Sequence, residues 1–158
     1  MPSLLFICTA NICRSPMASA LFQIICLEKH DMQSWRVESA GTWSHEGDPA
    51  VEGTKSVMKS RGIDISSHRS RLVRKEIIEE FDLILTMERG HKEALQYEFP
   101  SQASRIYMLS EIVGLEFDIK DPFGGPLAGY EKTANEIEML LRDGFNTILS
   151  LVSNNYSG

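Results

Sequence analysis

The chain has 158 residues, a mass of 17.8 kDa and a formal net charge of −6. This length suits one domain with a single full core. With 42% hydrophobic and 24% charged residues, the composition is that of a folded globular protein and argues against disorder. The acidic balance argues against a general nucleic-acid binder and a polybasic membrane-surface protein. An anionic ligand would therefore have to be attracted by a local site.

No apolar run approaches the roughly 18 residues that span a bilayer, so we expect no membrane insertion. The apolar stretch near the start has no basic segment before it, which argues against a signal peptide. Cys8, Cys13 and Cys26 form too small and odd a set for a secreted disulfide framework. We therefore expect a cytoplasmic protein with free thiols. The histidines show no metal-ligand spacing, so we predict no metal and no cofactor.

Strands and helices are predicted to alternate along the chain. Residues 4–7 form a continuous apolar run, typical of a strand buried on both faces. Further strands are predicted over residues 35–40, 81–86 and 105–109. After a first helix from residue 16, helices are predicted over residues 50–61, 88–99 and 129–152, with a loop over 121–129. This alternation predicts one α/β domain over residues 1–158, a doubly wound, four-stranded parallel sheet with helices on both faces.

The first helix has a strong start signal in Ser15-Pro16. Ser15 is expected at the N-cap and Pro16 at the first helical position. Cys26 is expected on the face away from the core. The apolar residues at helical spacing, which should face the core, are Met17, Ala20, Leu21, Ile24 and Leu27.

The segment from Cys8 to Pro16 joins the first strand to this helix, at the sheet edge where ligands bind in such folds. Successive backbone N–H groups in a tight loop can form an anion-binding nest, and the helix N-terminus adds further donors. Arg14 offers a planar fork for two oxygens of a phosphate-like dianion, and Asn11 tolerates a left-handed backbone. The same surroundings stabilise a thiolate at Cys8. A lone cysteine at a strand end is more often a small apolar residue, but Arg14 and the helix start favour a nucleophile.

These residues resemble the low-molecular-weight protein tyrosine phosphatase family. The family's Asn-Ile-Cys-Arg-Ser-Pro stands at residues 11–16 and overlaps a Cys-x5-Arg motif that runs from Cys8 to Arg14, close to the start of the sequence. Further matches follow at residues 39–42, 62–68, 81–87 and 121–124. The resemblance implies a flavodoxin-like, phosphotyrosine phosphatase I-like fold. Ala10 stands where many members have glycine, and we expect a backbone there that alanine can adopt.

The resemblance implies hydrolysis of phosphotyrosine and aryl phosphates in two steps. Cys8 attacks phosphorus, while Arg14 and the loop hold the phosphate oxygens. Asp121 protonates the leaving phenolate and then acts as base toward the water that hydrolyses the phosphocysteine. The alternative for Asp121 is an ordinary loop aspartate. The residues of the implied phosphate-binding loop are Thr9, Ala10, Asn11, Ile12, Cys13 and Ser15.

Supporting roles are also implied by the resemblance. Ser39 and His68, with Asn11, would hold the loop from behind. Ser15 has two candidate positions, as the cap of the helix or as a donor to the Cys8 thiolate. Cys13 would trap an oxidised Cys8 as a disulfide and make the protein redox-sensitive; the alternative is that it only packs behind the loop.

The substrate rim is predicted from aromatic residues. Phe123 and Trp43 could stack on a phenyl ring, although a core position is the alternative for Trp43. Related protein arginine phosphatases tend to carry threonine at the position of Ile12, so this aliphatic residue favours phosphotyrosine. A protein arginine phosphatase is the alternative within the family.

Three other classes of protein are alternatives to a phosphatase of this family. A thioredoxin-linked arsenate reductase would need later shuttle cysteines, and a cysteine phosphocarrier of a sugar transport system would need neither Arg14 nor Asp121. A non-catalytic phosphate-binding module would not need the set of Cys8, Arg14 and Asp121. We expect a monomer that acts on phosphotyrosine proteins, a tyrosine kinase being one candidate.

Overall fold

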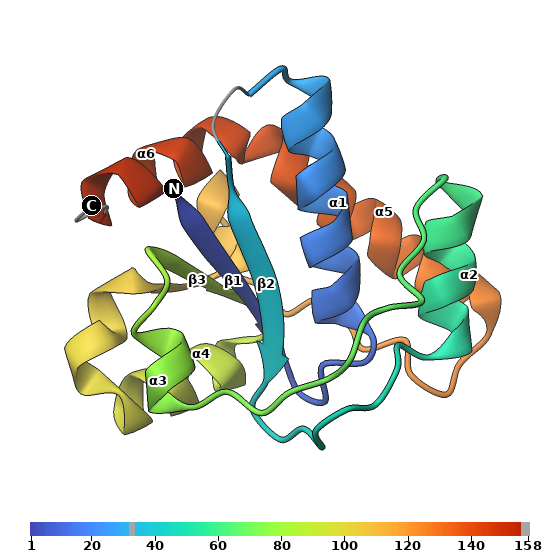
Figure 1. The fold of residues 1–158 in the computed structure, drawn as a ribbon, viewed down its shortest axis with the longest axis horizontal. Coiled ribbons are helices and arrows are strands. Elements are labelled where there is room, and N and C mark those ends of the chain that lie inside the picture. Colours follow the sequence, from blue (N-terminus) through green and yellow to red (C-terminus); the bar gives the residue numbers. More distant parts are fainter. Residues whose placement is uncertain (32–33, 156–158) are drawn as a thin grey trace.

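The computed structural model describes residues 1–31 and 34–155 of the chain. Four parallel strands form one sheet in the order β2-β1-β3-β4, and helices cover both of its faces (Figure 1). The predicted α/β class with a four-stranded parallel sheet is therefore confirmed. The strands are β1 (Ser3–Cys8), β2 (Arg36–Gly41), β3 (Leu83–Thr86) and β4 (Ile106–Met108). The helices are α1 (Arg14–Glu28), α2 (Glu52–Ser60), α3 (Lys75–Ile78), α4 (Arg89–Glu98), α5 (Leu127–Asp143) and α6 (Phe145–Asn155), with 3-10 turns η1 (Pro100–Arg105) and η2 (Leu109–Val113).

The sheet separates two apolar clusters, and β1 supplies both because all six of its residues are buried. Leu4 and Phe6 pack into the larger cluster with α1, α5 and α6. Leu5 and Ile7 point the other way, into the smaller cluster with α3 and α4. Alternate side chains of one strand thus hold both layers, which explains the continuous apolar run in the sequence.

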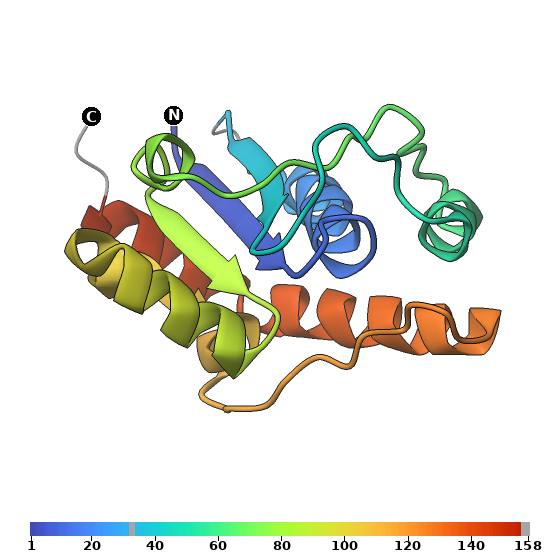
Figure 2. The same cartoon turned by 90° about the horizontal axis from the view of Figure 1, so that it is seen from below.

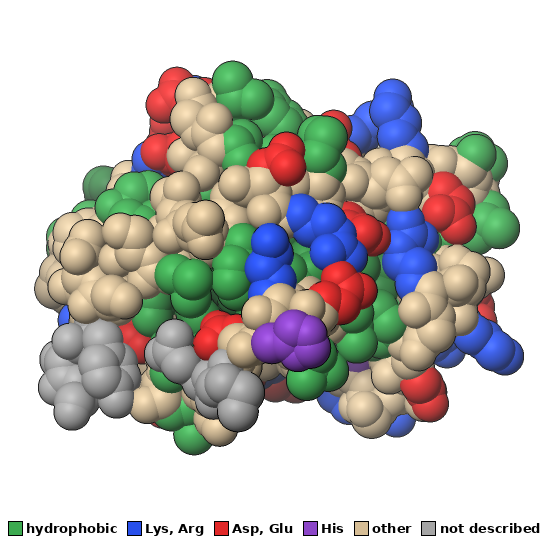
Figure 3. Space-filling view, turned by 90° about the horizontal axis from the view of Figure 1, so that it is seen from above, with side chains coloured by type: hydrophobic (Ala, Val, Ile, Leu, Met, Phe, Trp, Pro, Cys, Tyr) green, Lys and Arg blue, Asp and Glu red, His purple; other side chains and the backbone are tan. Residues whose placement is uncertain are grey.

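The strands end together at one edge of the sheet, and the register brings Cys8 opposite Gly41 and Ile7 opposite Thr86. Figure 2 views the molecule from this end. A Cβ atom at Gly41 would lie 2.4 Å from the carbonyl oxygen of Thr9, so glycine permits the close approach of the two chains here. At the opposite end, acidic and basic side chains lie intermixed (Figure 3).

The predicted single helix over residues 129–152 is wrong, because the chain breaks at Gly144 into α5 and α6. A Cβ atom at Gly144 would lie 2.4 Å from Cγ1 of Ile112. The break lets α5 pack on α1 and α2 while α6 turns to pack on β3 and η2. Helix α3 and the two 3-10 turns were not predicted either, since each is too short to show a periodic pattern.

Helix α1 also differs from its prediction. It begins at Arg14, so Cys13 and not Ser15 occupies the N-cap. Cys26, predicted on the outer face, is 7% exposed, whereas Leu27, predicted to face inward, is 73% exposed. The reason is that α1 packs against the sheet on one side and α5 on the other, so a broad sector of the helix is buried. No helix in the described ranges is long and apolar enough to cross a bilayer.

Candidate active site

The loop after β1 directs all of its carbonyl groups toward neighbouring segments. Each carbonyl of residues 8–13 accepts a hydrogen bond from a donor outside the loop. The backbone N–H groups of residues 9–13, by contrast, have no acceptor among the described residues. These N–H groups are therefore available to an anion, as in a nest. The donors to the carbonyls, in chain order of acceptor, are Thr42 N (3.0 Å), Trp43 N (2.9 Å), Ser44 Oγ (2.8 Å), His68 Nε2 (2.7 Å), Val51 N (2.9 Å) and Thr54 Oγ1 (3.4 Å).

Asn11 fixes the middle of the loop. Its backbone is left-handed, with φ of 59°, while Ala10 has no positive φ. The buried amide donates from Nδ2 to Ser15 Oγ at 2.8 Å and to Ser39 Oγ at 2.9 Å, and Oδ1 accepts the Arg71 N–H at 3.0 Å. Both Nδ2 hydrogens and one lone pair of Oδ1 are thus bound inside the protein.

Cys8 lies at the base of the loop, 2% exposed, with its Sγ atom 3.0 Å from Ser15 Oγ. Because Ser15 Oγ already accepts a hydrogen from Asn11, its own hydrogen is free to point at the sulfur. Ser15 itself lies in the first turn of α1. Of its two candidate positions, Ser15 therefore takes the one beside Cys8, which suits a thiolate.

The second thiol of the loop has a different environment. Burial raises the pKa of Cys13 to about 12, and Thr54 Oγ1 lies 3.5 Å from its Sγ atom and opposes this shift. Cys13 therefore remains protonated near neutral pH. Burial likewise raises the pKa of Cys26, a core residue of α1, to about 12.

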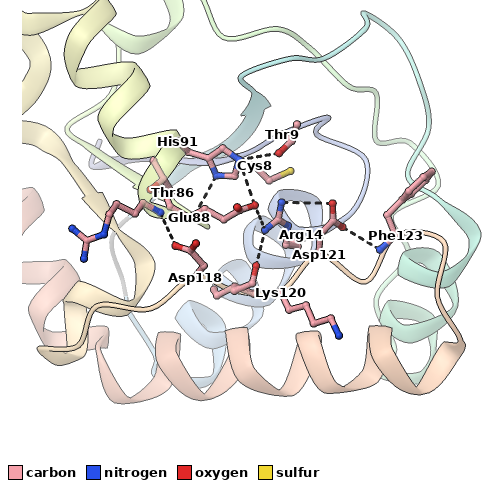
Figure 4. A network of polar contacts seen from close by, with 12 residues as sticks. Cys8, Thr9, Arg14, Thr86, Glu88, His91, Asp118, Lys120, Asp121 and Phe123 are labelled. Carbon is pink, nitrogen blue, oxygen red and sulfur yellow. Dashed lines mark hydrogen bonds and ion pairs between the residues drawn. The ribbon is translucent and has the colours of Figure 1, made fainter.

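Arg14 is 1% exposed and reaches across the end of the sheet (Figure 4). Its Nη1 atom lies 2.6 Å from Glu88 Oε2 and donates to the Ile119 carbonyl at 2.6 Å. Nη2 lies 3.7 Å from Asp121 Oδ2, and Nε is buried without a partner among the described residues. One edge of the fork is thus held by the protein, and the Nε–Nη2 edge remains for a ligand.

These groups line a cavity of about 130 Å³. Asp121 closes one side with a carboxylate that is 47% exposed, and its Oδ1 atom accepts the Phe123 N–H at 3.1 Å. Phe123 is 62% exposed at the same wall. The lining comprises Cys8, Thr9, Ala10, Ile12, Cys13, Arg14, Asp121 and Phe123.

Trp43 is 84% exposed, so its alternative as a core residue is wrong. Its backbone N–H binds the Thr9 carbonyl, which places the chain beside the loop, but its ring is not part of the cavity lining. Of the two predicted rim aromatics, Phe123 alone borders the cavity.

His68 lies behind the loop, where Nε2 donates to the Asn11 carbonyl. Burial lowers the pKa of His68, outweighing the opposite effect of that hydrogen bond. Within the described residues, no cluster of three His, Cys, Asp or Glu side chains is arranged to hold a metal ion.

Glu88 and His91 also lie at the site, although neither was predicted as a site residue. His91 Nε2 lies 2.9 Å from Thr9 Oγ1, and Glu88 binds Arg14. The sequence does contain a signal for these two residues, because Glu-x-x-His after a buried strand is similar to a helix capping box. A helix that begins there places both side chains at the sheet edge where ligands bind.

A family model described as low molecular weight phosphotyrosine protein phosphatase matches residues 3–152. The chain belongs to this family. It is therefore a protein phosphatase, a hydrolase that acts on phosphoproteins. The match to this family thus extends far beyond the Cys-x5-Arg segment and includes all four strands of the sheet.

Relatives within the low molecular weight phosphatases carry two kinds of name. A protein-arginine-phosphatase of Geobacillus stearothermophilus is 40% identical over 87% of this chain and 90% of its own length. A human low molecular weight phosphotyrosine protein phosphatase is 34% identical over 82% of this chain and 84% of its own. A solved YwlE arginine phosphatase mutant with a phosphorylated active site serine has a TM-score of 0.87 and 32% identity, covering 94% of this chain and 95% of its own.

Proposed function

We propose that this phosphatase hydrolyses phosphotyrosine in proteins through a phosphocysteine intermediate on Cys8. The observation that carries the proposal is a set of donors around one sulfur that have no partner within residues 1–31 and 34–155: the N–H groups of residues 9–13 and the buried Nε of Arg14. A buried, unpaired donor costs free energy, so such a set is expected where a ligand supplies the acceptors. A phosphoryl group has the charge and the oxygens that this set requires.

In the first step, the Cys8 thiolate attacks phosphorus in line with the ester bond. The S–P bond forms as the bond to the phenolic oxygen breaks, and Asp121 gives its proton to that oxygen. The loop amides and the Nε–Nη2 edge of Arg14 hold the three equatorial oxygens, where charge builds up. Asp121 suits the role of acid because its carboxylate lines the cavity and is also 47% exposed, so it can exchange its proton with solvent.

In the second step, water attacks the phosphocysteine. Asp121, now ionised, takes a proton from this water, the S–P bond breaks, and inorganic phosphate leaves with the thiolate restored. Ser15 stabilises that thiolate from 3.0 Å. The phosphorylated active site serine in the solved relative supports a covalent step at the equivalent position of the loop.

Ile12 favours phosphotyrosine over phosphoarginine. Its apolar side chain lines the cavity, where it can pack against a phenyl ring but offers no acceptor to a guanidinium. The second candidate function, protein arginine phosphatase, is favoured by the name of the 40% identical relative. A polar substituent at this position would satisfy the N–H groups of phosphoarginine, whereas isoleucine leaves them unpaired.

The substrate class is tested by comparing kcat/KM for one peptide carrying phosphotyrosine and the same peptide carrying phosphoarginine. We expect the wild-type protein to prefer phosphotyrosine and Ile12→Thr to move the ratio toward phosphoarginine by roughly tenfold, the effect of about one hydrogen bond. A wild-type preference for phosphoarginine would replace this proposal by the second candidate. Val51→Thr, which places the same side chain next to the loop but outside the cavity lining, is the matched control.

The reaction class is tested with para-nitrophenyl phosphate. The wild-type protein should release para-nitrophenol continuously with inorganic phosphate, while Cys8→Ser should not turn over. Accumulation of a stable phosphoprotein by the wild-type protein would indicate a phosphocarrier instead. Phosphate binding without any turnover would indicate a binding module.

A further inference from the structure

The first turn of α4 holds two polar side chains to which the proposed reaction gives no role. Glu88 stands at the N-cap, and His91 follows three residues later with 7% of its surface exposed. The two form a capping box, in which the Glu88 N–H donates to His91 Nδ1 at 3.2 Å. This turn lies at the same sheet edge as the cavity, because α4 follows β3.

The contacts of His91 define a neutral ring with one hydrogen. Since Nδ1 accepts the Glu88 N–H, the hydrogen of the imidazole sits on Nε2. Nε2 lies 2.9 Å from Thr9 Oγ1 and 3.7 Å from Glu88 Oε2, so it donates to the threonine (Figure 4). His91 therefore joins the start of α4 to the first residue of the cavity loop.

The charges around His91 are consistent with that neutral form. Burial is the largest influence and lowers the pKa of His91, and Arg14 acts in the same direction. Glu88, Asp118 and Asp121 oppose it without reversing it.

Glu88 extends the arrangement to the guanidinium. Its carboxylate forms an ion pair with Nη1 of Arg14 at 2.6 Å, and the Ile119 carbonyl accepts a hydrogen bond from the same nitrogen. These two contacts leave the Nε–Nη2 edge of the guanidinium directed toward the cavity. The side chain of Glu88 is 34% exposed and long, so a fixed position needs an anchor. The reciprocal capping box with His91 supplies one at the backbone of Glu88.

We propose that His91 is a positioning residue for the oxyanion site, fixing Thr9 through Nε2 and the Glu88–Arg14 pair through Nδ1. It touches no substrate atom and acts only through these neighbours. This inference rests on the proposed function, since it assumes that the loop and Arg14 bind a phosphate-like oxyanion. It adds that the geometry of the loop depends on the first turn of α4 and not on the loop alone.

Two variants separate the two bonds of His91. In His91→Gln, the side-chain amide can reach Thr9 as Nε2 does but loses the acceptor for Glu88 N–H. In His91→Asn, the carbonyl oxygen can take the place of Nδ1 but cannot reach Thr9. The probe is sulfate, an oxyanion whose binding is measured by calorimetry on the whole protein and requires no turnover. Failure of the proposed reaction would therefore leave this measurement interpretable.

We expect the two variants to rank in opposite orders for sulfate affinity and for thermal stability. His91→Asn should weaken sulfate binding roughly 3- to 10-fold, the effect of one lost hydrogen bond to the loop. His91→Gln should weaken it less, because it keeps the bond to Thr9 and loses only the backbone anchor of Glu88. In thermal unfolding the order should reverse, because His91→Gln loses the cap of α4 and His91→Asn keeps it. If sulfate affinity simply followed thermal stability in both variants, His91 would be structural only and the proposal would be wrong.

A double-mutant cycle tests the path through Thr9. Thr9→Val removes the hydroxyl with little change in shape, and should weaken sulfate binding about as much as His91→Asn. The two changes together should cost little more than either one, since both remove the same bond. Independent, additive losses would overturn the proposed coupling. Gln96→Ala, which removes hydrogen bonds from α4 to the Ala103 and Ile106 carbonyls far from the loop, controls for general loosening of the helix.

Discussion

The two loops that meet at the cavity are built in opposite ways. In the loop of residues 8–15, every carbonyl up to Cys13 is bound to a neighbouring segment, and Asn11, Arg14 and Ser15 are at most 1% exposed. In the loop of residues 118–126, the Asp121 carboxylate is 47% exposed and most residues face solvent. The first loop is rigid because its polar groups have partners inside the protein.

The difference corresponds to the two tasks in the proposed reaction. Stabilising charge on phosphoryl oxygens needs donors fixed in advance, since reorganisation during the reaction would consume the gain. Passing a proton to a departing group needs an acid that reaches both solvent and substrate, which an exposed loop permits. Substitutions in and around each loop test this division of tasks.

The largest effect is expected at Arg14. Arg14→Lys should lower kcat for para-nitrophenyl phosphate by at least roughly 10³-fold and should also weaken inhibition by inorganic phosphate, because a point charge cannot replace the Nε–Nη2 fork. Steady-state kinetics measures both. Arg61→Lys, which changes an arginine paired with Glu131 and Glu138 on α5, should leave both constants unchanged. Near-normal turnover of Arg14→Lys would contradict the proposed geometry.

A change in the exposed loop should separate catalysis from binding. Asp121→Asn should lower kcat for aryl phosphates on the order of 10²-fold, since the leaving phenolate loses its proton donor. The inhibition constant of inorganic phosphate should change by less than about threefold, since the oxyanion site is intact. Equal losses in both quantities would assign Asp121 to binding or folding. Asp118→Asn, a nearby carboxylate that binds the Arg89 N–H, is the matched control.

The two thiols of the rigid loop should behave differently toward peroxide. We expect peroxide to oxidise the Cys8 thiolate to a sulfenic acid and the Cys13 thiol then to displace water from it, forming a disulfide that a dithiol reduces. Wild-type activity should therefore return after dithiol treatment, whereas Cys13→Ser should stay mostly inactive. Cys26→Ser, altered in the core, should recover like the wild type. Full recovery of Cys13→Ser would refute this protective role.

The smallest effect is expected from the histidine behind the loop. Because burial lowers the pKa of His68 in the folded protein, the unfolded chain binds more protons as pH falls below the ordinary value of 6.5. The contribution of His68 to stability is therefore fully present above that value and is lost as pH falls through it. Chemical denaturation at several pH values should show a shallower acid loss for His68→Gln than for the wild type. A steeper acid loss in the variant would be the wrong sign for this account.

Much of the fold followed from local patterns in the chain. The apolar run of β1 predicted a strand buried on both faces, and alternating strands and helices predicted the parallel sheet. What local patterns could not predict was the break at Gly144, because it depends on contact with Ile112 in η2, 32 residues earlier in the chain and only brought near by folding. The prediction of which face of α1 is buried was wrong for the same reason, because α5, which is distant in sequence, packs against that helix.

Residue types and their spacing in the sequence indicated the candidate nucleophile and the arginine, whereas the candidate acid, Asp121, followed from the resemblance to the phosphatase family. The sequence also indicated that Asn11 could take a left-handed backbone, which the residue type allows. How these groups are held is visible only in the folded protein, where Ser15 lies against the sulfur, Glu88 binds the guanidinium and His91 binds Thr9. Hydrogen bonds and ion pairs act over about 3 Å, and which partners come that close depends on how separate strands and helices pack.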